Sequence, residues 1–207
     1  MTLDHAPDSR LPFEFGAVEL LTERLILRLP RLSDVATIAK LANDRELAEN
    51  TARVPHPYRR EHAEAWVADA AISAAGATFG LYTKDDDRFV GACGLECRDR
   101  AIELGYWIGK SDRNAGLATE AARAAIDFGF THLRREELIA SARVNNPASR
   151  RVLEKCGFQW TGVALVRSKA LAASVPVDRF RLDRKSWASL RAWGTVPLAA
   201  CPAIQAA

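Results

Sequence analysis

A short segment rich in small residues, Arg113-Asn-Ala-Gly-Leu-Ala-Thr119, has the composition of an anion-binding turn. It follows a strand-like segment and runs directly into a helical pattern, and Ala115, Gly116 and Ala118 leave the backbone amides uncovered. The first turn of a helix carries amides without internal partners and the positive end of the helix dipole, which together suit a phosphate or pyrophosphate. The Arg113 side chain can add a charge-assisted bond. The alternative is an ordinary strand-to-helix turn, because neither GxGxxG nor GxxxxGK[ST] is present.

Ser149 is the second residue whose type and position suit chemistry. Asn146 fits a helix N-cap and Pro147 fits the first helical position. Ser149 then lies in the first turn, three and four residues before Val152 and Leu153, and shares their inward face. An inward hydroxyl can donate a hydrogen bond to a bound group. The alternative is a bond to its own helix backbone, which is common for a serine at a helix start.

Strands and helices on both sides must position these residues. Period-two alternation predicts strands, and apolar residues three and four apart predict helices. The predicted strands cover residues 22–29, 78–83, 89–96, 102–109, 137–144, 158–167 and 177–183. The predicted helices cover residues 33–43, 61–75, 147–156 and the segment from the small-residue turn to about 132. This order predicts an α/β fold of mixed α+β type, with one mixed sheet and helices on both faces.

Composition excludes several classes of protein. The 207 residues are 48% hydrophobic and 27% charged, which is typical of a globular domain, and the net charge of +3 is too small for a nucleic-acid-binding protein. No apolar run is long enough to cross a membrane, and the first ten residues do not resemble a signal peptide, so we expect a cytoplasmic protein. The four cysteines (Cys93, Cys97, Cys156 and Cys201) show neither disulfide nor metal spacing, and we expect buried, reduced thiols and no metal.

Five ordered segments resemble the GNAT N-acetyltransferase superfamily, and in particular its RimJ/RimL-like branch of ribosomal-protein alanine acetyltransferases. Arg113-x-x-Gly116-x-Ala118 matches the Q/R-x-x-G-x-G/A acyl-CoA loop of that family. The matching segments lie in the family's order within residues 21–187. They are Leu21-Thr-Glu-Arg-Leu-Ile-Leu-Arg28, Val90-Gly-Ala-Cys-Gly-Leu95, Glu103-Leu-Gly-Tyr-Trp-Ile108, Gly116-Leu-Ala-Thr-Glu-Ala121 and Asn146-Pro-Ala-Ser-Arg-Arg-Val-Leu-Glu-Lys-Cys-Gly-Phe158.

The resemblance implies a GNAT fold, in which a single twisted, mostly antiparallel sheet contains one splayed parallel pair of strands. The diverging strands would be residues 103–108 and 138–144, with the pantetheine of acetyl-CoA between them and its pyrophosphate on the amides of residues 114–119. Gly105 and Gly109 permit a close approach to this first strand. The residues expected to bind acetyl-CoA, the cosubstrate, are Trp107, Ile108, Arg113, Asn114, Ala115, Gly116, Leu117, Ala118, Thr119, Asn146 and Arg151. By the same resemblance, Arg150, Arg151 and Lys155 lie beside the mouth of the cofactor groove, where they can reach the adenosine phosphates, and a solvated helix face is the alternative.

Amide formation from a thioester requires deprotonation of the amine and protonation of the leaving thiolate, but no covalent nucleophile. Many members of the family place a tyrosine four residues after the serine as the general acid, and this chain has Leu153 there. Ser149 is therefore the better candidate for the catalytic donor to the thioester sulfur. The cysteines need not react.

Glu103 is the preferred catalytic base, acting through a water. Alternation places it on the face of its strand that carries Gly105 and Trp107, opposite Tyr106. A glutamate paired with an arginine is the plainer alternative, and Glu96 on the neighbouring strand is the second candidate. Tyr106 is expected to be mainly a packing residue.

The sequence thus predicts an N-acetyltransferase that uses direct transfer. We expect an N-terminal arm (1–20), a catalytic domain (21–187) and a C-terminal tail (188–207). The leading acceptor is a primary amine, such as a protein N-terminal alanine or serine, bordered by the loop that carries His56 and Tyr58. The alternatives are a small-molecule amine and a CoA-binding sensor without catalysis. No nucleic acid or membrane partner is expected, whereas the apolar C-terminal segment and a free sheet edge suit a homodimer.

Overall fold

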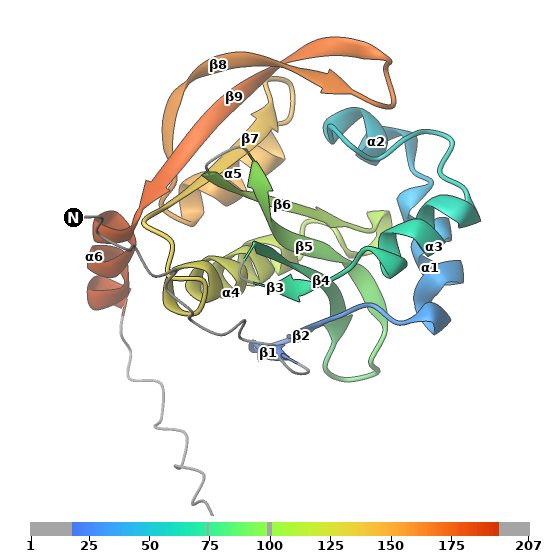
Figure 1. Ribbon diagram of the computed structural model, residues 1–207, viewed down its shortest axis with the longest axis horizontal. Coiled ribbons are helices and arrows are strands. Elements are labelled where there is room, and N and C mark those ends of the chain that lie inside the picture. Colours follow the sequence, from blue (N-terminus) through green and yellow to red (C-terminus); the bar gives the residue numbers. More distant parts are fainter. Residues whose placement is uncertain (1–17, 74, 99–100, 195–207) are drawn as a thin grey trace, which may run out of the picture.

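The computed structural model describes residues 18–73, 75–98 and 101–194. In these residues nine strands form one sheet in the order β1-β2-β4-β5-β6-β7-β9-β8, and β3 pairs with β4 beside this path. The pairing of β6 with β7 is parallel, and the other pairings are antiparallel. The sheet is twisted and has helices on both faces (Figure 1). This confirms the fold class expected from the sequence.

The strands are β1 Leu20–Leu21, β2 Leu25–Arg28, β3 Ile72–Ser73, β4 Gly76–Thr83, β5 Phe89–Arg98, β6 Ala101–Ile108, β7 Glu137–Arg143, β8 Gln159–Ser168 and β9 Ala173–Asp183. The α-helices are α1 Val35–Ala42, α2 Arg45–Asn50, α3 Arg60–Ala68, α4 Leu117–Thr131, α5 Pro147–Lys155 and α6 Arg184–Gly194. Short 3-10 turns lie at Leu32–Asp34 and Lys110–Asp112.

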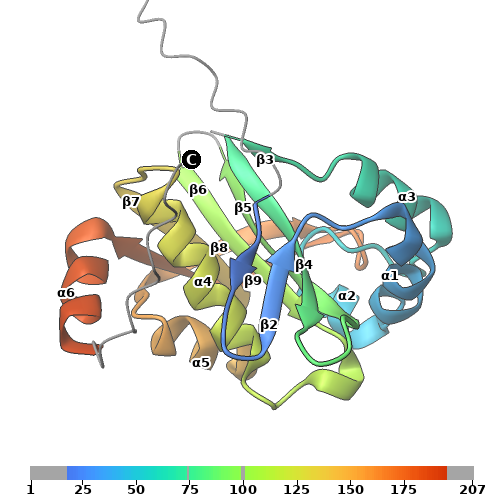
Figure 2. The same cartoon turned by 90° about the horizontal axis from the view of Figure 1, so that it is seen from below.

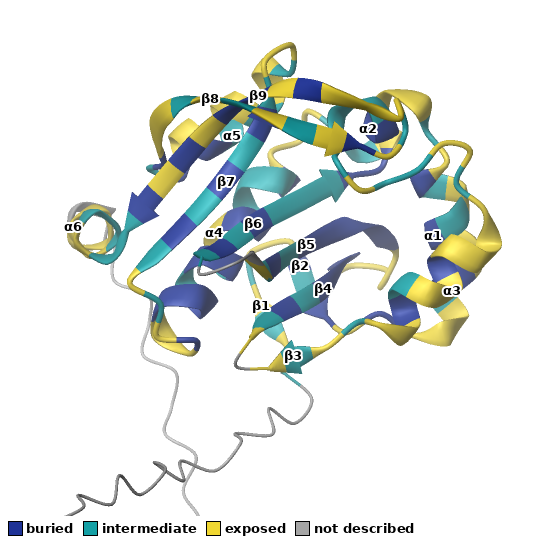
Figure 3. Ribbon diagram, turned by 45° about the horizontal axis from the view of Figure 1, so that its top comes forward, coloured by how far each residue is buried: buried dark blue, intermediate teal, exposed yellow. Residues whose placement is uncertain are grey.

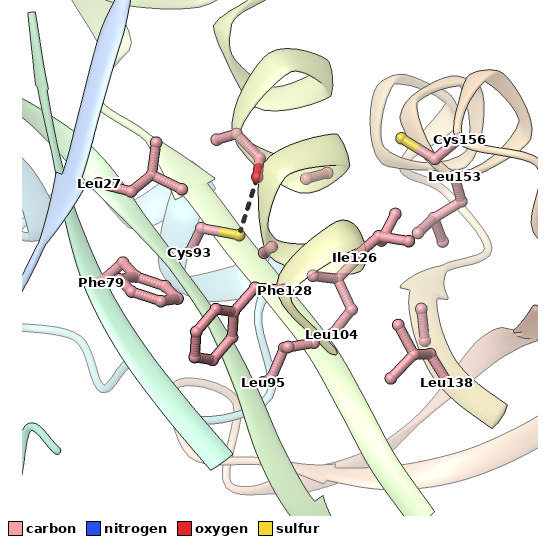
Figure 4. Packing of buried hydrophobic residues seen from close by; sticks show 14 of the residues in the cluster. Leu27, Phe79, Cys93, Leu95, Leu104, Ile126, Phe128, Leu138, Leu153 and Cys156 are labelled. Carbon is pink, nitrogen blue, oxygen red and sulfur yellow. Dashed lines mark hydrogen bonds between the residues drawn. The ribbon is translucent and has the colours of Figure 1, made fainter. Parts of the chain in front are cut away.

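The main core lies between the sheet and α4, which crosses one face of β2, β5 and β6 (Figure 2). Ala121 and Ala125 are fully buried, because small side chains let the helix approach the strands closely. Phe128 meets Phe79 edge to face, with ring centroids 5.6 Å apart, and Leu95 and Leu104 complete this layer (Figure 4). This packing fixes the position of the α4 N-terminus, where the small-residue turn ends.

A second, smaller core lies on the opposite face. Val35 and Ile38 of α1 and Val67 of α3 pack there against Tyr82 and Phe89. The alternation of buried and partly exposed residues along β7 marks the two faces of the sheet (Figure 3). The two cores together hold α1 and α3 on one side of the sheet and α4 on the other.

Several boundaries differ from those expected. The helix expected over 61–75 ends at Ala68, because Ile72–Ser73 pairs with β4 instead. α2 was not expected, since a helix of six mainly polar residues has little apolar periodicity. The expected boundary at 187/188 lies inside α6. Trp187 of this helix stacks on Phe130, with ring centroids 4.9 Å apart. The remainder of the expected arm and tail, residues 1–17 and 195–207, lies outside the described residues, and so does Cys201.

No helix formed by the described residues is both long and apolar enough to traverse a bilayer.

Candidate active site

The two parallel strands β6 and β7 separate partway along their length. They pair only at Ile102–Leu138, Glu103–Ile139 and Leu104–Ala140. Beyond these three rungs both strands continue, β6 to Ile108 and β7 to Arg143, without pairing with each other. A cleft of about 1550 Å³ includes this opening. The splayed pair implied by the resemblance is therefore present, and it leaves one backbone edge of β6 accessible.

The small-residue turn is exposed and lies at the start of α4. Gly116 is the N-cap of α4 with φ +82°, and Asn114 also has a positive φ, of 64°. Left-handed residues of this kind form concave backbone nests that bind anions. Within the described part of the chain, the amides of residues 114–118 donate no hydrogen bond. The turn therefore has the uncovered amides that a pyrophosphate requires.

Arg24 and Glu120 hold this turn against the first hairpin. Arg24 donates from Nη1 to the Ala115 carbonyl at 2.8 Å and forms an ion pair with Glu120 at 2.7 Å. Glu120 Oε1 also accepts from Thr22 Oγ1 at 2.6 Å and from the Arg24 amide at 2.7 Å. Burial opposes the charge on Glu120, but these hydrogen bonds and the guanidinium outweigh it and hold the pKa of the carboxyl below its ordinary value.

A pH-dependent stability difference is expected when Glu120 is replaced by glutamine. Because the native pKa is lowered, the ionised carboxyl stabilises the fold above its ordinary pKa of 4.5, and this contribution is lost as the pH falls through the native value. Glu120→Gln should therefore lower the melting temperature at pH 7, and the difference from the parent should disappear under strongly acidic conditions. Calorimetric melting curves across this range test it, and a difference that is constant with pH would contradict it.

Arg113 lines the cleft, and its contact with the cofactor stays a prediction. Its guanidinium donates to Asp44 Oδ2 at 2.6 Å, to Glu46 Oε2 at 3.0 Å and to the Ile108 carbonyl at 3.1 Å. Asp44 is the N-cap of α2 and accepts from the amides of Glu46 and Leu47, and its pKa is lowered although burial opposes this. Arg113 thus joins the turn to α2, and two carboxylates already satisfy its charge.

The other expected cofactor residues lie mostly in the cleft. Its lining includes Trp107, Ile108, Asn114, Gly116, Leu117, Ala118, Thr119, Asn146, Arg151 and Lys155. Ala115 is not part of this lining, and its carbonyl is bonded to Arg24. Arg150 does not line the cleft, and its guanidinium pairs with Glu154 and Asp178, as the alternative of a solvated helix face implies.

Ser149 lies in the first turn of α5, facing the cleft. Its amide donates to Asn146 Oδ1 at 3.1 Å, which confirms the predicted N-cap. Its hydroxyl lies 3.0 Å from the Tyr106 hydroxyl, which also contacts the Ser149 carbonyl at 3.0 Å. Burial is the main cause that raises the pKa of Tyr106 above its ordinary value, so the phenol keeps its proton. The structure therefore joins a serine on a helix to a protonated tyrosine on β6.

Glu103 lies at the middle of the three rungs, just before the strands separate. Ser141 of β7 donates to Glu103 Oε1 at 3.0 Å. Glu96, the second candidate, is directly opposite Glu103 on β5 and forms an ion pair with Arg53. Both carboxylates line the cleft, and so do Tyr58 and His62, whereas His56 does not. Burial raises the pKa of Tyr58 to about 12.

Two of the three described cysteines are buried, as expected. Cys93 is packed beneath α4, and Cys156 follows α5. Burial raises the pKa of both thiols, that of Cys156 to about 11, which makes them poor nucleophiles. Cys97 does not fit the expectation, because it is exposed at the end of β5 and lines the cleft. The residues that the structure describes contain no cluster of metal-ligating side chains.

Tyr106 and Arg24 are the site residues that sequence reasoning missed. Alternation placed Tyr106 opposite Glu103, toward the helices, where a tyrosine rather than a phenylalanine needs a polar partner. This need for a polar partner was the sequence signal that could have identified Tyr106 as a site residue. Arg24 lies within one of the five matching segments, but nothing in its own segment indicates that it reaches a turn 91 residues away.

Comparisons with known proteins agree with this geometry. A family model described as an acetyltransferase (GNAT) domain matches residues 24–159. An uncharacterized N-acetyltransferase of Bacillus licheniformis is 27% identical over 174 residues, which cover 82% of this chain and 98% of that protein.

Solved structures show the same fold. RimL, a ribosomal alpha-N-protein acetyltransferase in complex with coenzyme A, aligns with a TM-score of 0.71 at 15% identity, covering 82% of this chain and 99% of that one. Mycobacterium smegmatis RimJ in complex with a CoA disulfide aligns with a TM-score of 0.65 at 21% identity, covering 82% of this chain and 89% of that one. The family match spans well over half of the sequence and includes the split strands, the uncovered turn and Ser149. The chain belongs to the GNAT acetyltransferase family.

Proposed function

We propose that this protein transfers the acetyl group of acetyl-CoA directly to a primary amine, with a protein N-terminal alanine or serine as the leading acceptor. The observation that carries the proposal is a single cleft in which the uncovered amides of residues 114–118 lie beside the separated strands β6 and β7. Such a cleft can hold a pyrophosphate and a neighbouring extended arm at the same time. We propose the cytoplasm as its location, and a homodimer stays a prediction.

In this proposal the cofactor is held by backbone groups more than by side chains. The pyrophosphate accepts from the amides of the turn at residues 114–118, since the Thr119 amide already donates to the Gly116 carbonyl at 3.1 Å. The pantetheine lies along the free edge of β6 from Gly105 to Ile108. Arg151, Lys155 and Asn146 line the same cleft from α5 and its N-cap, and are proposed to contact the cofactor there.

The proposed reaction is one displacement. The amine, after losing its ammonium proton to Glu103 through a water, attacks the thioester carbonyl, and the carbon–sulfur bond breaks with the electron pair leaving on sulfur. Ser149 donates its hydroxyl proton to this thiolate and takes up the second proton that the attacking nitrogen releases, so the hydroxyl is restored, and Tyr106 holds it in place. No acyl-enzyme is needed, and the raised pKa values of Cys93 and Cys156 argue against one.

The names of structural relatives support a protein acceptor. RimL is described as an acetyltransferase of a ribosomal protein's alpha-amino group, and it shares this fold. A small-molecule amine is the second candidate, and a CoA-binding sensor is the third.

Thiol release from acetyl-CoA with libraries of peptides and small amines tests the proposal. We expect turnover with peptides that begin with alanine or serine, an added acetyl mass on their N-terminus, and intersecting double-reciprocal lines. Tight acetyl-CoA binding with no turnover of any amine would favour the sensor. An acetylated Cys97 that forms and decays at the turnover rate would overturn direct transfer.

Glu103→Gln is expected to flatten the rising limb of the pH–rate profile and to lower kcat, because the amide cannot accept the amine proton. General bases of this kind contribute on the order of 10²–10⁴ in rate. Glu96→Gln is the matched control, since it removes the opposite carboxylate on β5. If Glu96→Gln flattens the limb and Glu103→Gln does not, the roles are reversed.

A further inference from the structure

The part of the cleft that faces away from the α4 turn is lined by basic side chains from four segments. They follow α2, or lie on β7, on β9 and at the tip of the β8–β9 hairpin. These residues are Arg53, Arg143, Arg167, Lys169 and Arg179. Among the described residues, eight lysines and arginines line the whole cleft against five carboxylates. This excess of three positive charges equals the net charge of the whole chain, +3, so the positive charge is concentrated in the cleft.

Arg179 lies beside the proposed catalytic base. It is the β9 residue paired with Ser141 of β7, and Ser141 donates to Glu103. Paired residues of neighbouring antiparallel strands project to the same face, so Arg179 projects over the split of β6 and β7. Arg143 lies two residues beyond Ser141 on that face. It donates from Nη1 to the Glu49 carbonyl at 2.9 Å, but its Nε is buried without a hydrogen-bond partner.

The β8–β9 hairpin brings the remaining cations over the cleft. Its tip reaches the segment after α2 (Figure 1), where the Lys169 amide donates to the Ala52 carbonyl at 2.9 Å. This bond bridges the two walls of the cleft and places Arg167 and Lys169 in its lining. The backbone bond therefore holds these basic side chains in the wall of the cleft.

Most of these cations lack a carboxylate partner. Arg53 pairs with Glu96, whereas across the described ranges no carboxylate lies within ion-pair distance of Arg167, Lys169 or Arg179. The next arginine of β9, Arg181, projects to the same face but pairs with Glu137 and does not line the cleft. Like charges that line one cleft repel each other and attract an anion.

Given the proposed function, on which this step rests, we infer that the acceptor carries an anionic group close to its reacting amine. Arg179 and Arg143 bind that group while the amine faces Glu103. The anion comes either from an acidic side chain near the start of a peptide or from the carboxylate of a small amino acid. The cofactor phosphates do not account for these cations, because the uncovered amides for them lie at the N-terminus of α4.

The experiment compares matched acceptors with the full-length protein. Peptides that begin Ala-Glu-Glu and Ala-Gln-Gln differ only in charge, and free glutamate and its diamide form the same pair for a small acceptor. We expect kcat/KM to be about tenfold higher for the acidic member, as a hydrogen bond to a charged group predicts, and the difference to shrink with added salt. Arg179→Gln should remove most of this preference without changing acetyl-CoA affinity, and Arg181→Gln should preserve it.

Binding separates this inference from the proposed function. Titration of each peptide onto the protein with coenzyme A present needs no turnover, so an acidic preference lost in Arg179→Gln would support the inference even if no peptide is acetylated. A preference confined to free glutamate would assign the anion to a small amino acid. Equal binding and equal kcat/KM for acidic and amide acceptors would overturn the inference while leaving the acetyltransferase activity intact.

Discussion

Replacing Gly116 with glutamate is expected to weaken acetyl-CoA binding by at least about 100-fold, with the fold preserved. The new side chain puts a negative charge among the amides proposed to hold the pyrophosphate. A φ of +82° adds strain, because a residue with a Cβ loses on the order of 1–2 kcal/mol there, and each 1.4 kcal/mol is about tenfold in affinity. Isothermal titration of acetyl-CoA measures the loss.

Gly116→Gln is the matched control, since it introduces the same strain and bulk without the charge. Nearest to the new Cβ is Arg24 Nη2, at 3.4 Å, so both variants should fold and give similar melting temperatures. We expect glutamine to cost less affinity than glutamate. If both variants bind acetyl-CoA as well as the parent does, the turn is structural and the cofactor lies elsewhere.

The sequence predicts the parts of this site that local pattern determines. Alternation identified β6 and β7, and the N-cap Asn146 with Pro147 identified the start of α5. Small residues identified the turn before α4. In each case the pattern lies within a few neighbouring residues, so it does not depend on how distant segments pack.

The rest depends on contacts between distant segments. Arg113 has the right type and position for an anion ligand, but α2 brings Asp44 and Glu46 within reach, and its own charge is satisfied there. Cys97 was expected in the core, yet it lies near the end of β5, where the strand has left the cover of α4. The local sequence determines neither outcome, because each depends on which distant segment the fold places next to the residue.

The same reason explains why Tyr106 was taken for a packing residue. It does pack beside the main core, and its hydroxyl also reaches Ser149. A position four residues after the serine was the expected place for a tyrosine, and Leu153 there is fully buried. The phenol enters from β6 instead, a strand that is 43 residues earlier in the chain.

Ser149→Ala is expected to lower kcat by about 10²–10⁴, the range for a general acid, and to leave acetyl-CoA affinity nearly unchanged. The hydroxyl matters most when charge develops on the leaving sulfur, so the ground-state complex is little affected. Removing the hydroxyl leaves the helix start intact, because the bond to Asn146 uses the Ser149 amide. Single-turnover rates with a good amine acceptor, together with titration of acetyl-CoA, separate the two quantities.

Tyr106→Phe distinguishes a shared proton path from independent packing. If Tyr106 acts through the Ser149 hydroxyl, the two substitutions act on one unit, and the double variant should be about as slow as Ser149→Ala alone. If the tyrosine only packs, Tyr106→Phe should lower kcat by the same factor in the parent protein and in the Ser149→Ala variant. A loss of kcat under about threefold in a folded Ser149→Ala variant, far below the range for a general acid, would assign the serine a purely structural role in the first turn of α5.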